Sequence, residues 1–194
     1  MSVQINYKNT LNKKLTNSIL FVDENFSISG IKKYTSKQEY SYISDLITSK
    51  DTKKKIISFD VDAKRKITLI SLKRNIKNFE VVNLGAKFYD MHKNFKEKKY
   101  NLISDTLSYI TKSAIAYFLH GLKLKSYNFD KYKTKKNKNS LHINVTGKLK
   151  PDLKDQIKFV QPFEMLYSSD EILYLTNDRV LFPCTSHDQK QRNH

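Results

Sequence analysis

Apolar residues alternate with polar residues, or form short continuous runs, at several places along the chain, and these patterns predict β-strands. Residues 3–7 alternate, whereas residues 18–22 form the apolar run expected of a strand buried on both faces. Residues 55–61 also suit a strand, and 66–72 suit another, rich in β-branched side chains; the basic link between them is short enough for a hairpin. Further strands are predicted at 100–103, 141–145 and 157–160.

Between these strands, apolar residues recur every three or four positions, as they do in helices with one buried face. The first predicted helix begins at Ser36, and Glu39 stands where it would complete a capping box. The second runs from residue 77 to residue 95 and contains Gly85, which costs about 1 kcal/mol relative to alanine inside a helix. We expect a close contact between this helix and the sheet to explain that glycine. The predicted buried faces are Tyr40, Ile43, Leu46 and Ile47 in the first helix and Val81, Val82, Gly85, Phe88, Tyr89, His92 and Phe95 in the second.

A third helix is predicted to begin at Ile103, with Ser104 as its N-terminal cap. It is predicted to end at Gly121, because glycine commonly terminates helices. A fourth helix is predicted at 163–175, where the apolar pattern is less regular. The apolar stripe of the third helix consists of Ile103, Leu107, Ile110, Ala114, Tyr117 and Phe118.

Strands that alternate with helices of this length predict an α/β fold, with a mixed sheet flanked by helices in three layers. A chain of 194 residues buries roughly 70% of its surface, which is enough for one domain with a core. We expect the domain core at residues 1–132. A basic link with further strands follows at 133–160, and a helix with a polar, flexible C-terminus at 161–194.

One stretch of the chain resembles a known family. Residues 121–136, GLKLKSYNFDKYKTKK, resemble the helix end and exit segment that close the N-terminal domain of the M17 leucyl aminopeptidases, or cytosol aminopeptidases. Residues 67–73 are similar to a strand of that domain, and residues 83–86 are similar to the glycine-containing part of the following helix. Ser71 and Lys73 depart from the pattern, since they stand where the family tends to have glycines. The resemblance implies a macrodomain-like topology.

The resemblance covers roughly residues 1–160 and implies a non-catalytic domain with a packing, oligomerisation or regulatory role. Its partner would be a catalytic aminopeptidase domain or a second copy of the chain. In the family, the catalytic domain binds two divalent metals such as Zn or Mn through an Asn-Thr-Asp-Ala-Glu-Gly-Arg motif and a Gly-Lys-Gly motif. Neither motif occurs in this sequence. We therefore expect no catalytic, metal-binding or cofactor-binding residue in the chain, as in a truncated or split metallo-aminopeptidase.

The strongly basic composition leaves a second interpretation open. The chain carries 36 Lys and Arg against 19 Asp and Glu, a net charge of +17. A small nucleic-acid-binding protein would use lysines interleaved with aromatic residues to hold a single strand. The lysines are nevertheless scattered along the chain, which favours a solvated basic exterior with only nonspecific affinity for nucleic acid. The residues predicted to contact nucleic acid are Lys131, Lys133, Lys135, Lys136, Tyr127 and Tyr132.

Few side chains are candidates for catalysis. No two of the five histidines have the spacing of metal ligands. We expect His120 to lie at a helix C-terminus, where the helix dipole favours a cation, and His92 to be a satisfied, partly buried histidine. Asp60 and Asp62 would share one face of a strand beside basic residues, which favours ion pairing over acid–base chemistry.

The remaining sequence features concern ligands and location. The chain has only four glycines and no glycine-rich phosphate-binding loop, which argues against binding of ADP-ribose. The single cysteine, Cys184, excludes an internal disulfide; although it precedes His187 by three residues, it is expected to be a thiol in a flexible end. Since no signal-peptide pattern or membrane-length apolar run occurs, we expect a soluble, cytoplasmic protein that does not contact membranes.

Overall fold

The computed structural model describes residues 2–9, 17–49, 54–62, 65–94, 99–126 and 140–155, together with two short strands near the C-terminus. The chain divides into two compact units, Met1–Val160 and Gln161–His194. In the second unit, β7 (Leu175–Thr176) and β8 (Arg179–Val180) pair antiparallel. The predicted strand at 157–160 lies outside the described residues, and so does the predicted helix at 163–175 except for Leu175, which begins β7.

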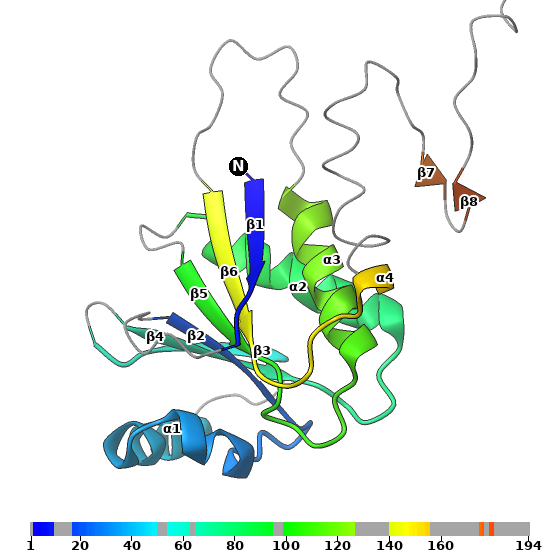
Figure 1. Cartoon of the computed structure of the whole chain (residues 1–194). Helices are drawn as coiled ribbons and strands as arrows, with labels where there is room; N and C mark the ends of the chain where they lie inside the picture. Colours follow the sequence, from blue (N-terminus) through cyan, green and yellow to red (C-terminus); the bar gives the residue numbers. More distant parts are fainter. Residues whose placement is uncertain are drawn as a thin grey trace, which may run out of the picture. The chain divides into compact units, whose positions relative to one another are not determined.

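The first unit is an α/β fold built on a six-stranded mixed sheet with the strand order β1-β6-β5-β2-β4-β3 (Figure 1). All neighbouring strands run parallel except β3, which pairs antiparallel with β4 at one edge. Among the described residues, the strands predicted from residue 3 to residue 145 and the predicted hairpin between 55–61 and 66–72 are thus confirmed. The strand predicted at 141–145 is β6, which lies between β1 and β5. The strands are β1 (Ser2–Tyr7), β2 (Asn17–Val22), β3 (Ile56–Asp60), β4 (Lys66–Ser71), β5 (Lys99–Ile103) and β6 (Ser140–Thr146).

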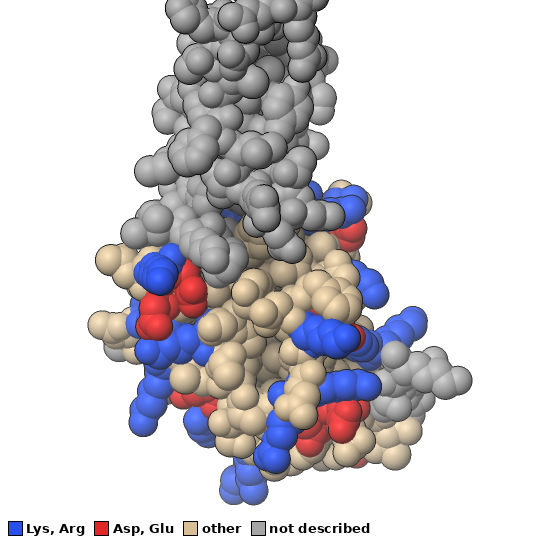
Figure 2. Space-filling view, turned by 90° about the vertical axis from the view of Figure 1, so that its right-hand side faces the viewer, with Lys and Arg blue, Asp and Glu red and all other residues tan. Residues whose placement is uncertain are grey.

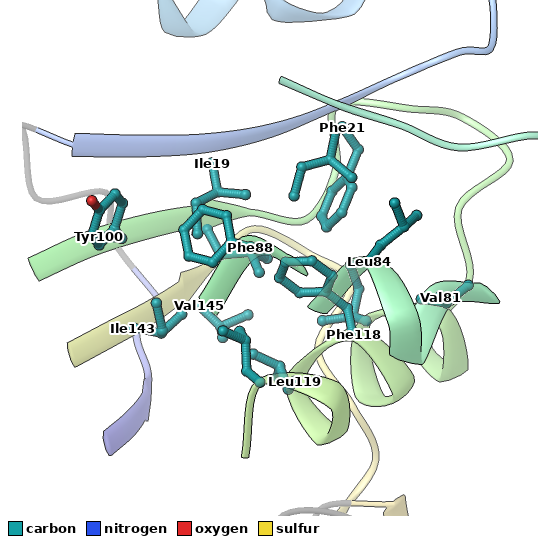
Figure 3. Close-up of a cluster of buried hydrophobic side chains, with 14 of the residues drawn as sticks. Ile19, Phe21, Val81, Leu84, Phe88, Tyr100, Phe118, Leu119, Ile143 and Val145 are labelled. Carbon is teal, nitrogen blue, oxygen red and sulfur yellow. The ribbon is translucent and has the colours of Figure 1, made fainter. Parts of the chain in front are cut away.

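Helices cover both faces of this sheet, which gives three layers (Figure 1). The helices are η1 (Ser29–Tyr34), α1 (Lys37–Ser49), α2 (Asn78–His92), α3 (Lys112–Ser126) and α4 (Leu153–Asp155). Alternate residues of β2 point into two separate clusters, as the two-residue period of a strand requires. Ile19 and Phe21 pack with α2 and α3 (Figure 3), whereas Leu20 and Val22 pack with Ile31 of η1 and with α1. Burial on both faces explains why this segment is a continuous apolar run.

The start of α1 follows the predicted capping box. The backbone N–H of Ser36 donates to Glu39 Oε2 at 2.8 Å, and the backbone N–H of Glu39 donates to Ser36 Oγ at 3.2 Å. Two N-terminal N–H groups are therefore satisfied by local side chains. The predicted buried face is also confirmed, since Ile43 is fully buried and Tyr40, Leu46 and Ile47 pack partly buried against the same cluster.

The predicted boundaries of the third helix were wrong at both ends. Ile103 is the last residue of β5, where it pairs with Thr146, and α3 begins only at Lys112. Ser104 caps no helix: it is buried, and both its N–H and its hydroxyl donate to the Thr146 carbonyl. The cap is Thr111, whose Oγ1 accepts a hydrogen bond from the Ala114 N–H at 3.1 Å. Pairing with β6 thus keeps Ile103 in the strand that was predicted at 100–103, and residues 104–111 separate this strand from α3.

Gly121 does not end α3, which continues to Ser126. A Cβ atom at Gly121 would overlap the Val82 carbonyl of α2, and a Cβ atom at Gly85 of α2 would overlap the Phe118 carbonyl of α3. The two glycines thus allow two helix backbones to touch. The expectation that Gly85 contacts the sheet was wrong, because its close neighbour is the facing helix.

The contact between α2 and α3 brings a cluster of aromatic rings against the sheet (Figure 3). The ring centroids of Phe88 and Phe118 lie 6.0 Å apart, and those of Phe21 and Phe118 lie 5.6 Å apart, both pairs in edge-on arrangements. Leu84, which was not among the residues predicted for the buried face of α2, is buried in the same cluster. No helix in the described part of the chain is long and apolar enough to cross a membrane.

Substituting Gly85 by alanine tests the helix contact. On an exposed helix surface Gly→Ala stabilises by about 1 kcal/mol, but here the new methyl group meets the Phe118 carbonyl and forces the helices apart. We expect Gly85→Ala to lower the free energy of unfolding by about 1–3 kcal/mol in urea titrations. The exposed Asn83→Ala on the same helix is the control and should be neutral or slightly stabilising. A Gly85→Ala protein more stable than the wild type would contradict the contact.

Candidate functional site

The carboxyl edge of the parallel strands is the first place to look for a site, because α/β sheets bind ligands outside the carboxyl ends of their strands. The crevice is expected where consecutive connections leave for opposite faces of the sheet. Here that point is the end of β2, since the chain after β2 forms η1 and α1 on one face, whereas α3 follows the neighbouring β5 on the other (Figure 1).

Thr106 fills the space between the ends of β2 and β5. Beyond the pair formed by Leu20 and Ile103, the two strands are no longer paired. The Phe21 N–H donates to Thr106 Oγ1 at 3.0 Å, and Thr106 Oγ1 donates to the Phe21 carbonyl at 2.8 Å. One buried hydroxyl therefore satisfies both backbone groups that the end of β5 leaves unpaired.

Gly30 closes the same crevice from the other face of the sheet. A Cβ atom at Gly30 would overlap the carbonyl oxygen of Thr106, so η1 lies directly against the loop that follows β5. Only a residue without a side chain fits between them. The loop residue Thr106 is thus held by β2 through its hydroxyl and by η1 through its carbonyl.

Asp105, beside Thr106, binds two side chains of η1. Its Oδ1 accepts a hydrogen bond from the Tyr34 hydroxyl at 2.7 Å, and Lys33 Nζ lies 3.8 Å from its Oδ2. Burial is the main reason why the pKa of Tyr34 is raised, with the hydrogen bond to Asp105 acting in the same direction. A Cβ atom at Gly147, which has φ +110°, would crowd both Asp105 and Ser104. This carboxylate therefore joins η1 to the ends of β5 and β6.

Two further side chains at this edge, Asp23 and Tyr109, bind the chain's own backbone. Asp23 Oδ1 accepts the N–H groups of Asn25 at 3.1 Å and Ser27 at 2.7 Å, which fixes the turn after β2. The Tyr109 hydroxyl donates to the Leu72 carbonyl at 2.7 Å. Thr106, Asp105, Asp23 and Tyr109 thus hold loops together at the carboxyl edge, and Thr106 with Gly30 closes it between β2 and β5.

His92 of α2 lies in the core with a shifted pKa. It is fully buried, stacks on Phe88 at 4.1 Å between ring centroids, and its Nδ1 lies 2.8 Å from the Phe88 carbonyl. Because a carbonyl can only accept, Nδ1 donates, and Nε2 is left to accept from the hydroxyls of Ser58 or Thr68, each 3.3 Å away. Burial lowers the pKa of His92 to about 4.

This environment makes His92 a core residue. A catalytic serine needs a base that is oriented by an acidic or polar group and a route for substrate. The Nδ1 partner of His92 is its own helix backbone, and the hydroxyl of Thr68 competes with that of Ser58 for the same nitrogen. His92 is thus satisfied, as predicted, although it is more deeply buried than the sequence indicated.

The other predicted residues fall into two groups. Asp60 forms an ion pair with Lys66 at 3.0 Å, as the ion-pairing interpretation predicts, and Asp62 Oδ1 accepts the Arg65 N–H at 2.7 Å. His120 was wrongly expected at a helix end, since α3 continues beyond it. The remaining candidates lie outside the described residues: Lys131, Lys133, Lys135, Lys136, Tyr127, Tyr132, Cys184 and His187.

Basic side chains are spread over the described surface. Figure 2 shows Lys and Arg side chains around a largely uncharged centre, with acidic side chains beside several of them. Several described lysines form ion pairs, such as exposed Lys112 with Asp152 at 2.9 Å. Among the described residues, no three His, Cys, Asp or Glu side chains lie close enough together to hold a metal ion.

Sequence reasoning missed the role of Thr106 and Gly30. A signal for Gly30 was its rarity, since the chain has only four glycines and each therefore invites a structural reason. Thr106 offered no such signal, because its partner Phe21 is distant in sequence and only the sheet order brings the two together.

Comparisons with known proteins place the fold in a broad group. Neither protein-family models nor curated proteins match the chain. Among solved structures, a mutant of tomato leucine aminopeptidase is similar, with a TM-score of 0.54 and 15% identity, over 81% of this chain and 35% of that one. The macrodomain of Thermus aquaticus DarG has a TM-score of 0.48 and 8% identity over 75% of this chain and 98% of that one. The bottromycin maturation enzyme BotP has a TM-score of 0.47 and 8% identity over 76% of this chain and 30% of that one.

Removing the Thr106 hydroxyl tests the closed edge. Thr106→Val keeps the shape of the side chain but leaves the N–H and carbonyl of Phe21 without that partner, so we expect a loss of about 1–3 kcal/mol in the free energy of unfolding. Thr106→Ser retains the hydroxyl and should cost clearly less. Equal stability of the two variants in urea titrations would mean that the hydroxyl does not hold the edge.

The lowered pKa of His92 predicts that the free energy of unfolding depends on pH. Its pKa is about 4 when folded against an ordinary value of 6.5, so the unfolded chain binds a proton first as pH falls. The stability that comes from keeping His92 neutral is fully present above pH 6.5 and is lost as the pH falls from 6.5 to 4. The loss in the free energy of unfolding reaches roughly 3 kcal/mol at pH 4. Urea titrations from pH 7 to 4 should show this loss in the wild type. His92→Gln lacks the titrating group and should lose less over the same range; equal losses would refute the assignment.

Proposed function

We propose that this chain is a non-catalytic docking domain that resembles the N-terminal domain of leucyl aminopeptidases. Its role is to pack against a partner, which is a catalytic aminopeptidase domain or a second copy of the chain. The fold it shares with tomato leucine aminopeptidase over 81% of its length supports this proposal. The chain covers only 35% of that enzyme, so the aminopeptidase activity of the tomato protein belongs to a much longer chain.

The observation that carries the proposal is the closed carboxyl edge. An α/β protein that binds a small ligand keeps an open crevice there, with backbone N–H groups free to meet the ligand. In this chain Thr106 occupies the gap, Gly30 brings η1 against it, and Asp105 binds Tyr34. Such an edge suits a scaffold whose function lies on its outer surfaces.

The buried polar cluster favours the same proposal. A Ser–His contact is a feature of hydrolases, but that of Ser58 and His92 lies between β3, β4 and α2 in the core. The low pKa of His92 follows from its burial and leaves the ring neutral at physiological pH. The cluster is best understood as a satisfied polar contact between helix and sheet.

The net charge of +17 supports a second candidate, a nucleic-acid-binding protein. The lysines proposed for it, Lys131, Lys133, Lys135 and Lys136, lie outside the described residues. On the described surface, basic residues are dispersed and several are paired with acidic ones. The docking proposal is therefore the stronger of the two.

An activity assay tests the docking proposal. Purified protein should not hydrolyse a leucyl-anilide substrate, with or without added Mn²⁺, because no residue of the chain matches a metal-binding or catalytic motif of the family. An active leucyl aminopeptidase assayed in parallel provides the positive control. Turnover that co-purifies with the protein and disappears on addition of a chelator would overturn the proposal.

A further inference from the structure

An open pocket of about 600 Å³ lies between the edge strand β3 and helix α2. Its lining comes from the start of β3 and from the second half of α2. On the strand side the residues are Lys54, Lys55 and Ile56, and on the helix side they are Lys87, Asp90 and Met91. Three lysines and two apolar side chains thus converge on one hollow.

The pocket lining is positively charged, since it contains three lysines and one carboxylate. Asp90 lies 3.1 Å from Lys93 Nζ and 3.2 Å from Lys125 Nζ, so two lysines neutralise its carboxylate. Lys55 pairs with Glu80 at 3.3 Å. In the part of the chain that the structure describes, neither Lys54 nor Lys87 forms an ion pair. These two lysines flank the hollow from opposite sides and are available to an anionic group.

The floor of the pocket is apolar and contains no aromatic ring. Ile56 is 6% exposed and supports the floor, whereas Met91 is 43% exposed and provides an adaptable apolar surface. A single nucleic-acid strand needs aromatic faces on which its bases stack, and the lining residues include none. An aliphatic side chain flanked by carboxylates matches the lining better than a nucleotide does.

The neighbouring strand edge adds a way to hold an extended chain. Within the described residues, β3 is paired only on its β4 side and forms one end of the sheet. A peptide lying along β3 would pair its backbone with that edge, while its side chains reach the pocket. The strand edge, the two lysines and the apolar floor are therefore suited to the same occupant.

From these features we infer that the pocket between β3 and α2 binds an acidic peptide segment of a partner protein, with one aliphatic side chain on Met91 and flanking carboxylates at Lys54 and Lys87. The inference rests on the docking role proposed above and names the surface and the chemistry of the partner. Charge complementarity is the reason for choosing an acidic segment over a second copy of this basic chain, which would repel it.

Binding of a labelled acidic peptide with one central leucine, followed by fluorescence anisotropy at low ionic strength, tests the inference. The wild type should bind this peptide more tightly than a matched peptide with alanine in place of the leucine. Lys54→Gln combined with Lys87→Gln should weaken binding about fivefold, because two exposed ion pairs are lost. The matched control combines Lys32→Gln with Lys37→Gln in η1 and α1, and should bind as the wild type does.

A second pair of variants tests the apolar floor. Met91→Ala should abolish the preference for leucine over alanine in the peptide, whereas Phe79→Ala, which removes an exposed apolar side chain from the same helix outside the pocket, should preserve it. Circular dichroism spectra would establish that all variants are folded.

Three results would overturn the inference. One is wild-type affinity in the Lys54 and Lys87 double variant, and another is an equal loss in the Lys32 and Lys37 control. The third is displacement of the peptide by a single-stranded oligonucleotide of equal charge with no dependence on the leucine, which would make the pocket a general anion site. Each of these can occur in a protein without peptidase activity, so they are distinct from failure of the proposed function.

Discussion

The close contact between α2 and α3 is the interaction on which the rest of the domain depends. Gly85 and Gly121 face the backbone of the opposite helix, and each would clash if it carried a side chain. The contact sets the height of both helices above the sheet and so decides which side chains reach the core. Phe88 and Phe118 fill the space beneath, and Phe21 of β2 completes the cluster (Figure 3). The packing of two glycines therefore positions one complete layer of the fold.

The other layer is attached through the carboxyl edge of the sheet. Thr106 continues the hydrogen bonding of β2 where β5 has ended, and Gly30 lets η1 approach the same loop. These contacts use the polar groups that a ligand-binding α/β protein would direct toward its ligand. In the described residues, the side chain of Thr106 and the close approach at Gly30 fill the position between the ends of β2 and β5.

Net charge alone gives little information about those surfaces. Much of the positive charge is dispersed or paired, as Lys93 and Lys125 are with Asp90, and exposed pairs of this kind contribute little to stability. The pocket beside β3 differs because its lysines flank apolar side chains next to a strand edge that no described strand pairs with. Recognition there would depend on the combination of charge, apolar contact and backbone pairing rather than on total charge.

The sequence by itself determined the elements whose signals are local. The capping box of Ser36 and Glu39, the apolar run of β2 and the hairpin of β3 and β4 each depend on residues close together in the chain. The α/β class follows from their alternation. The pocket was harder to predict from the sequence. Lys54 stands in a run of three lysines at 53–55, but Lys87 lies beside it only because α2 packs over β3.

Tertiary structure decided everything that depends on distant partners. The apolar spacing after Ile103 suits a helix, but pairing with Thr146 of β6 keeps this residue in a strand and moves the helix start to Lys112. Gly121 has the usual chemistry of a helix end, yet α3 continues because the glycine lies against Val82 of α2. Local propensity differs by only about 1 kcal/mol between such alternatives, so strand pairing and helix packing outweigh it.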